Sequence, residues 1–230
     1  MIGSFCEEAR TENLDVWRPL LSHPFVLGLA DATLPPESFR FYVTQNILYL
    51  ADYARALAVG LSKTTDEDLL SRFAASVENI TVNELPQNRK LLASIAALCS
   101  GPAPATDAEP APGMVAYSSW LLATAARGSA IDVLTAIMPC AWSYGEIGRT
   151  LAGNMTPHPV YSGWIGFFAS ETYTAMVEGL RVELDSLVAA CDARERSRLK
   201  ALFRTACRME LRFWDMGWNR EQWADLVARK

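Results

Sequence analysis

The chain has 230 residues, of which 50% are hydrophobic and 20% charged, so it can bury the core of a domain and is not intrinsically disordered. Its 21 Lys and Arg against 26 Asp and Glu give a formal net charge of -5, the wrong sign for a nucleic-acid-binding surface. No apolar run approaches membrane-spanning length, and the first ten residues carry acids where a signal peptide needs basic and then apolar residues. We therefore expect a cytoplasmic protein with neither a nucleic-acid nor a membrane partner.

Glycine and proline separate long segments that are rich in alanine and leucine and have an apolar period of three to four residues. This pattern predicts an all-α fold, a single-domain helical bundle over residues 1–230. The expected helices cover residues 4–18, 36–61, 65–98, 114–127, 129–152, 160–168, 171–190, 193–218 and 220–229. Pro86 should kink or interrupt the third of them. Residues 100–113 (SGPAPATDAEPAPG) are rich in Pro and Ala and are expected to form a surface loop inside this one domain.

Several chemistries lack the residues that they require. The only histidines, His23 and His158, each precede a proline, so neither an HExxH nor a Glu-x-x-His metal motif is present. No GxxxxGK[ST], GxGxxG or GxSxG motif occurs. The five cysteines are widely spaced without a CxxC pair, which is typical of free thiols in a reducing compartment. We therefore expect no metal and no cofactor.

Polar groups interrupt the predicted apolar faces at three places. The first is the helix over 36–61, where Tyr42, Asn46, Tyr49 and Tyr53 are spaced by four, three and four residues and share one face. Such a face offers several hydrogen-bonding groups to a ligand. A half-exposed helix whose tyrosines pack their rings and leave their hydroxyls in water would show the same pattern.

The second place is Cys140, which shares a stripe of the helix over 129–152 with Tyr144. Pro139 removes a helix hydrogen bond just before the cysteine, a local irregularity that often marks a site. A thiol acts as a nucleophile only as thiolate, and a neighbouring tyrosine or carboxylate can manage its proton. A lone buried cysteine is more often a small hydrophobic residue.

The third place is Glu210, in the middle of an aromatic stripe of the helix over 193–218. An isolated carboxyl group there would be desolvated and its pKa raised, as in a group that exchanges a proton near neutrality. The alternative is a structural ion pair with Arg204, Arg208 or Arg212. These arginines lie mostly on other faces of the helix, which favours the acid role.

Four segments together resemble the TenA family, the class II thiaminases or aminopyrimidine aminohydrolases: HPFVLGLADATLPPESFRFYVTQN, MPCAWSYGEIG, HPVYSGWIGFF and CRMELRFWDMGW. The resemblance spans nearly the whole chain in the right order. It implies a bundle resembling haem oxygenase, assembly as a homotetramer and a small pyrimidine as substrate. The implied reaction hydrolyses 4-amino-5-aminomethyl-2-methylpyrimidine, and in some members thiamin, to 4-amino-5-hydroxymethyl-2-methylpyrimidine for thiamin salvage.

The resemblance also implies roles for individual residues. Cys140 matches the nucleophilic cysteine of the family's P-C-x-W-x-Y-x-E run, and Tyr144 matches the tyrosine of that run. Glu210 matches the glutamate that handles the proton on a pyrimidine nitrogen. Tyr49 matches an aromatic residue of the pocket wall, and Tyr117 matches a tyrosine that precedes the Pro-Cys helix.

Two positions depart from the family pattern. Asn46 stands where the family has a pocket aspartate, and Phe168 stands where it has a tyrosine. An amide can orient an aminopyrimidine by hydrogen bonds, whereas it cannot accept a proton. Both changes lie on the side that recognises the pyrimidine, so a different small amine or pyrimidine is an alternative substrate.

Two rival functions remain open on the sequence alone. A PqqC-like or haem-handling oxidase is disfavoured because the first predicted helix has no histidine to bind iron. A non-catalytic protein that binds a pyrimidine and regulates is the second rival. The acidic balance and the absence of a helix-turn-helix signature oppose direct contact with DNA.

Overall fold

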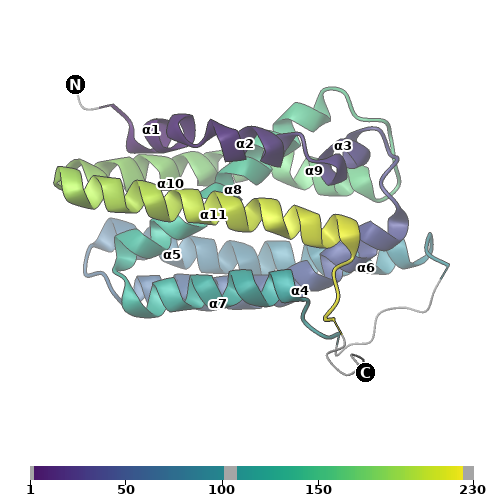
Figure 1. Ribbon diagram of the computed structural model, residues 1–230, viewed down its shortest axis with the longest axis horizontal. Helices are drawn as coiled ribbons and strands as arrows, with labels where there is room; N and C mark the ends of the chain where they lie inside the picture. Colours follow the sequence, from purple (N-terminus) through teal and green to yellow (C-terminus); the bar gives the residue numbers. More distant parts are fainter. Residues whose placement is uncertain (1–2, 101–107, 225–230) are drawn as a thin grey trace.

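The computed structural model describes residues 3–100 and 108–224, and every regular element in this part of the chain is helical, which confirms the all-α prediction (Figure 1). The elements are α1 (Phe5–Glu12), α2 (Leu14–Leu21), α3 (Pro24–Ala30), α4 (Pro36–Leu61), α5 (Glu67–Glu78), the π-helix η1 (Asn79–Glu84), α6 (Leu85–Ala96), α7 (Pro112–Arg127), α8 (Ala130–Ala152), α9 (Tyr161–Ala169), α10 (Glu171–Ala189) and α11 (Ala193–Asn219). In the view of Figure 1, α4 and α7 lie below the long helix α11, and α1 and α2 lie above it.

Helix α8 is the centre of the bundle. It contacts α4, α7, α9, α10 and α11, and 17 of its 23 residues are buried. A helix that is apolar all round must be enclosed by other helices, and this one is. Gly148 permits the close approach of α9, because a Cβ atom at this position would lie 2.6 Å from the backbone carbonyl carbon of Phe168. The segment that contains Cys140 therefore lies in the core, held on several sides.

The predicted helix over 4–18 is two helices, α1 and α2. Asn13 separates them, because its side-chain amide donates to the carbonyl of Ala9 at 2.7 Å and ends α1. An asparagine side chain competes for backbone groups in this way and favours helix ends. Helix α2 then continues beyond the predicted end to Leu21.

The predicted helix over 220–229 is wrong for the residues described there, since 221–224 are not helical. Helix α11 ends at Arg220, which has a left-handed backbone with φ of 51°. The carboxylate of Glu221 then accepts hydrogen bonds from Arg212 and from the amide of Gly113, which turns the chain toward the start of α7. Residues 225–229 of that prediction lie outside the described part of the chain.

The prediction that Pro86 interrupts the helix over 65–98 is confirmed. Helix α5 changes into the π-helix η1, and α6 begins beside the proline. Proline has no amide hydrogen, and its ring displaces the carbonyl four residues earlier, so a wider turn relieves the clash. Residues 101–107 of the loop predicted at 100–113 lie outside the described residues, whereas Pro112 and Gly113 already belong to α7.

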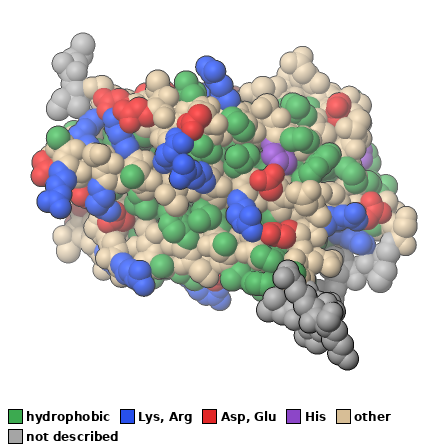
Figure 2. Space-filling model, in the orientation of Figure 1, with side chains coloured by type: hydrophobic (Ala, Val, Ile, Leu, Met, Phe, Trp, Pro, Cys, Tyr) green, Lys and Arg blue, Asp and Glu red, His purple; other side chains and the backbone are tan. Residues whose placement is uncertain are grey.

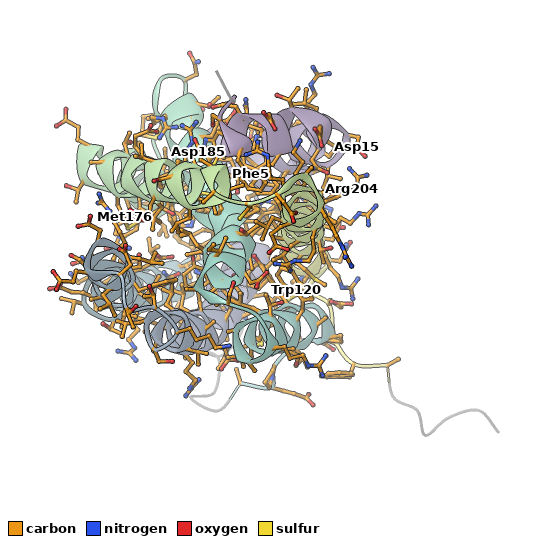
Figure 3. All side chains as sticks on the ribbon, turned by 90° about the vertical axis from the view of Figure 1, so that its left-hand side faces the viewer. Phe5, Asp15, Trp120, Met176, Asp185 and Arg204 are labelled. Atoms are coloured by element: carbon orange, nitrogen blue, oxygen red, sulfur yellow. The ribbon has the colours of Figure 1, made fainter. Side chains whose placement is uncertain are left out.

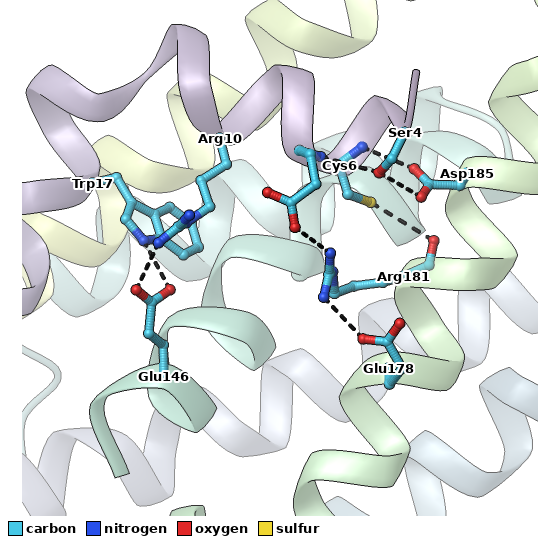
Figure 4. A network of polar contacts seen from close by, with 9 residues as sticks. Ser4, Cys6, Arg10, Trp17, Glu146, Glu178, Arg181 and Asp185 are labelled. Atoms are coloured by element: carbon cyan, nitrogen blue, oxygen red, sulfur yellow. Dashed lines mark hydrogen bonds and ion pairs between the residues drawn. The ribbon is translucent and has the colours of Figure 1, made fainter. Parts of the chain in front are cut away.

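A polar network joins the N-terminal helices to the outer face of α8 and α10 (Figure 4). The carboxylate of Glu146 accepts hydrogen bonds from Arg10 at 2.7 Å and from the indole of Trp17 at 3.2 Å. The guanidinium of Arg181 lies 4.1 Å from the ring centroid of Trp142. Trp142 and Glu146 of the MPCAWSYGEIG motif thus bind the N-terminal helices and α10 on one face of α8. The opposite face of α8 points into the interior of the bundle.

Side chains fill the space between the helices, as the end-on view of Figure 3 shows, and charged groups of both signs are interspersed on the face in Figure 2. Arg204 of α11 pairs with Asp15 of α2 at 2.6 Å. Exposed pairs of this kind contribute little, so the buried apolar core provides most of the stability. No helix within the described ranges is both long enough and apolar enough to span a membrane.

Candidate active site

A cavity lies between α4, α5, η1, α8, α9 and α10. Its polar and aromatic wall includes Cys140 and Tyr144 of α8, Glu84 of η1, Phe168 of α9, Tyr53 of α4 and Tyr173 of α10. Cys140 lies in the middle of the central helix, keeps some accessible surface and lines this wall. A larger surface groove between α4 and residues 219–223 contains neither cysteine nor histidine. The cavity at Cys140 is therefore the candidate site.

The local structure of α8 explains how the thiol is presented. Pro139 lies inside the helix and cannot donate a backbone hydrogen bond to the carbonyl of Thr135. Cys140 and Tyr144 are four residues apart, so they lie on the same face, and both line the cavity as their shared stripe predicts.

Behind the thiol, Glu210 of α11 is 1% exposed and accepts a hydrogen bond from the hydroxyl of Tyr117. Burial raises the pKa of this carboxyl group to about 7, while the contacts with Tyr117 and Cys140 oppose the rise. The ring of Tyr49 packs on Tyr117 with centroids 4.7 Å apart. Arg204 pairs with Asp15, and Arg212 pairs with Glu221. Neither pairs with Glu210, as expected from their positions on other faces of the helix.

Glu84 is a buried carboxyl group of the cavity that sequence reasoning missed. It is the last residue of η1, and its side chain lines the same cavity as Cys140. Burial and then the charge of Glu210 raise the pKa of Glu84 to about 8. The signal was present in the sequence, because Ser76, Ile80 and Glu84 are spaced by four and continue the buried face of α5.

Two buried carboxyl groups, those of Glu210 and Glu84, act on the thiol of Cys140. Burial raises its pKa well above the usual value, and the charges of Glu210 and Glu84 raise it further. The cysteine is consequently a thiol at neutral pH and becomes a nucleophile only when a neighbouring base takes its proton. Glu210, whose contact with Cys140 also affects its own pKa, is the base in reach.

Aromatic rings form the remaining wall. Tyr144 stacks on Trp214 with centroids 5.1 Å apart and meets Phe168 edge-on at 4.9 Å. The hydroxyl of Tyr42 donates to that of Tyr144 at 3.3 Å. Phe168 has no hydroxyl, so the phenols of the wall that contact its ring are those of Tyr144 and Tyr173. Flat apolar faces with a few polar groups suit a small planar ligand.

Asn46 lies apart from the cavity wall. Its side-chain amide donates to the side-chain oxygen of Asn88 at 3.1 Å, and Asn88 in turn donates to the backbone carbonyl of Glu84 at 2.9 Å. Cys140, Tyr144 and Phe168 are therefore together in the cavity. Glu210, Tyr117 and Tyr49 lie behind the thiol, and Asn46 reaches the site through η1.

Fold and site together define a class of protein: a helical bundle with an ionisable thiol and two buried carboxyl groups beside an aromatic cavity, an arrangement of small-molecule enzymes with a cysteine nucleophile. A domain from Shewanella denitrificans described as having a heme oxygenase-like fold shares this architecture, with a TM-score of 0.69 over 94% of this chain and 92% of that one at 15% identity.

Residues 11–220 match the model of the TENA/THI-4/PQQC family, and the chain belongs to this family. It is 34% identical over 222 residues to an aminopyrimidine aminohydrolase from Halalkalibacterium halodurans, which covers 96% of this chain and 98% of the relative. A TenA homologue protein from P. horikoshii OT3 superimposes with a TM-score of 0.83 at 32% identity, over 94% of this chain and 99% of that one. The resemblance seen in the four sequence segments is confirmed.

Proposed function

We propose that this protein is an aminopyrimidine aminohydrolase that converts 4-amino-5-aminomethyl-2-methylpyrimidine and water to 4-amino-5-hydroxymethyl-2-methylpyrimidine and ammonia. The observation that carries the proposal is the thiol of Cys140 in the cavity wall with Glu210 beside it. The names of relatives that match over nearly the full chain support the substrate class. Thiamin is a second candidate substrate, because the same methylene carbon bears its leaving nitrogen.

The mechanism follows from the order of the groups. Glu210 as carboxylate takes the proton of the Cys140 thiol, and the thiolate adds to the pyrimidine ring. The electron pair of a ring C=N bond moves to nitrogen, which takes the proton from Glu210. That nitrogen pair then expels the leaving amine from the methylene carbon, and water adds there and gives up one proton, which balances the proton that the amine takes as it leaves as ammonia. The C–S bond breaks, and the ring nitrogen returns its proton through Glu210 to the Cys140 sulfur, which restores the aromatic ring and the thiol.

The surrounding residues have positioning roles in this proposal. Tyr144 and Phe168 provide flat faces for the pyrimidine, and the Tyr117 hydroxyl holds Glu210 in one orientation, with Tyr49 packed on the ring of Tyr117. The groups that act are all side chains of this chain, so the reaction as proposed uses no metal or cofactor. We further propose that the protein acts in the cytoplasm as a homotetramer.

The test is detection of hydroxymethylpyrimidine by mass spectrometry after incubation of the pure protein with the aminomethyl compound and, separately, with thiamin. Cys140→Ala should lower kcat by at least about 10³-fold because it removes the nucleophile. Cys99→Ala, at a partly buried cysteine far from the cavity wall, is the matched control and should leave the rate unchanged.

Two results would contradict the proposal in different ways. If Cys140→Ala turned over the substrate within tenfold of the wild-type rate, the covalent mechanism would be wrong, although the substrate would be right. Absence of product from both compounds, with the helical fold intact, would remove the substrate and turn the search to other small amines or to pyrimidine binding without turnover.

A further inference from the structure

The proposed reaction leaves one step without a residue. An uncharged amino group is expelled from carbon as ammonia only if its nitrogen gains a proton as the bond breaks, and the proton on Glu210 is committed to the ring nitrogen. Glu84 is the carboxyl group in the cavity wall itself. Among the described residues, no hydrogen bond or ion pair to its carboxyl oxygens is found, although the residue is only 7% exposed. A buried carboxyl group without a partner is costly unless it is protonated or meets a ligand.

The fold directs this side chain into the cavity by means of the π-helix. Ser76, Ile80, Glu84 and Asn88 are all buried, and three successive spacings of four residues separate them. A regular α-helix, at 3.6 residues per turn, would rotate Asn88 about a third of a turn away from Ser76 over these 12 residues. The wider turns of η1 keep all four on one face. Such π-helical insertions are frequent at functional sites.

Neighbouring amides fix the backbone at Glu84 and leave its carboxyl group free. Asn88 donates to the carbonyl oxygen of Glu84 at 2.9 Å, and Asn46 holds the side chain of Asn88 at 3.1 Å. Both hydrogen bonds position the main chain. Glu84 itself lines the cavity together with Cys140, Tyr53 and Tyr144.

The two carboxyl groups face the thiol from different helices and have different partners. Glu210 accepts the hydroxyl of Tyr117, an interaction that favours its carboxylate form. Glu84 has no such donor, and the nearby Glu210 carboxylate disfavours a second negative charge. Of the two groups, Glu210 therefore loses its proton more readily, and Glu84 keeps its proton more readily.

We propose that Glu84 is a catalytic residue that protonates the departing amino nitrogen and then accepts a proton from the water that replaces it. This inference rests on the proposed function. As the methylene C–N bond breaks, its electron pair stays on nitrogen, which takes the proton of Glu84 and leaves as ammonia. Water then forms the new C–O bond and returns a proton to Glu84, so the carboxyl group is restored and every atom is accounted for.

The leaving group of the substrate distinguishes this role from a structural one. The uncharged amino group needs a proton to depart as ammonia, whereas the quaternary nitrogen of thiamin, or of the analogue that carries pyridinium in its place, departs as a neutral heterocycle without one. Glu84→Gln should therefore lower kcat for the aminomethylpyrimidine by about 10²–10⁴-fold, the usual contribution of a general acid. It should change cleavage of a quaternary substrate by less than about tenfold.

Glu78→Gln is the matched control, because Glu78 is an exposed glutamate on the preceding turns and should leave both rates unchanged. An equal loss on both substrate types, or no loss on the amine, would overturn the role of Glu84 while Cys140→Ala still tests the function itself. If the wild-type protein released no hydroxymethylpyrimidine at all, the proposed function would fail and the role of Glu84 with it.

Discussion

The two carboxyl groups beside Cys140 share burial and residue type and differ in their partners. Glu210 lies on a regular helix and accepts the hydroxyl of Tyr117. Glu84 lies at the end of a π-helix, and its anchors, Asn88 and Asn46, hold only its backbone. The comparison shows that burial alone does not define a carboxyl group's role. A single phenol donor separates a group that accepts a proton from one that holds it.

The largest expected effect separates the two groups by leaving-group dependence. Glu210→Gln should lower kcat by about 10²–10⁴-fold on the aminomethyl substrate and on thiamin alike, because protonation of the ring nitrogen precedes departure of either group. Steady-state kinetics on both substrates measures it. Selective loss on the amine alone would mean that the roles assigned to Glu210 and Glu84 are reversed.

The next effect concerns stability and pH. The pKa of Glu84 is raised from 4.5 to about 8 in the folded protein, so its protonated form stabilises the fold at low pH, and this contribution is lost as pH rises from about 4.5 through 8. A pKa that differs by one between the folded and unfolded protein corresponds to about 1.4 kcal/mol of stability. Glu84→Gln cannot ionise and should gain stability relative to the wild type at pH 8.5.

Thermal unfolding of both proteins from pH 5 to 9 measures this difference. The melting temperature of Glu84→Gln minus that of the wild type should rise by roughly 5 °C or more across the range, at about 2–4 °C per kcal/mol for a chain of this size. Surface carboxylates such as Glu8 and Asp15, whose pKa values are lowered by Lys200 and Arg204 respectively, contribute equally in both proteins. Their contribution to the pH dependence therefore cancels in the difference. A flat difference would show that Glu84 is hydrated and ionises freely.

A smaller effect should follow from Tyr117→Phe, which removes the donor to Glu210 and keeps the ring against Tyr49. A hydrogen bond to a charged group contributes about 1.5–3 kcal/mol, so the pKa of Glu210 should rise by about one to two. The acid limb of the pH profile of kcat/KM should move to higher pH by that amount, since Glu210 must be a carboxylate to take the thiol proton. If the acid limb did not move, the ionisation that it reports would belong to a group other than Glu210.

Much of this site could be predicted from helical periodicity. Cys140 with Tyr144, and Glu210 on its aromatic stripe, lie where a period of 3.6 residues places them, because α8 and α11 are regular helices through this region. Glu84 could also be found in this way, because a period of 3.6 residues places it on the face of the buried residues Phe73 and Ile80. Asn88 could not, because a regular helix would turn it about a third of a turn from Ser76, and only the wider turns of η1 keep it on the buried face.

The helix ends show the same limit. Asn13 divides one apolar pattern into α1 and α2 through a hydrogen bond of its own side chain, and α11 stops where Glu221 meets Gly113. The first event is local and the second depends on a segment more than 100 residues away. Periodicity reports which face is apolar, whereas tertiary contacts determine where the helix ends.

The smallest effect is expected at Asn46, which in this structure acts on Glu84 only through Asn88. Asn46→Asp removes the amide that donates to Asn88 and should cost about 1 kcal/mol of stability, the value of one buried hydrogen bond. Turnover of the aminomethyl substrate should change by less than about tenfold, because the carboxyl group of Glu84 remains in the cavity. Denaturant unfolding and kcat/KM on the same preparations measure both. A rise in kcat/KM of more than tenfold would mean that residue 46 contacts the pyrimidine directly. Glu84 would then act on the substrate only indirectly.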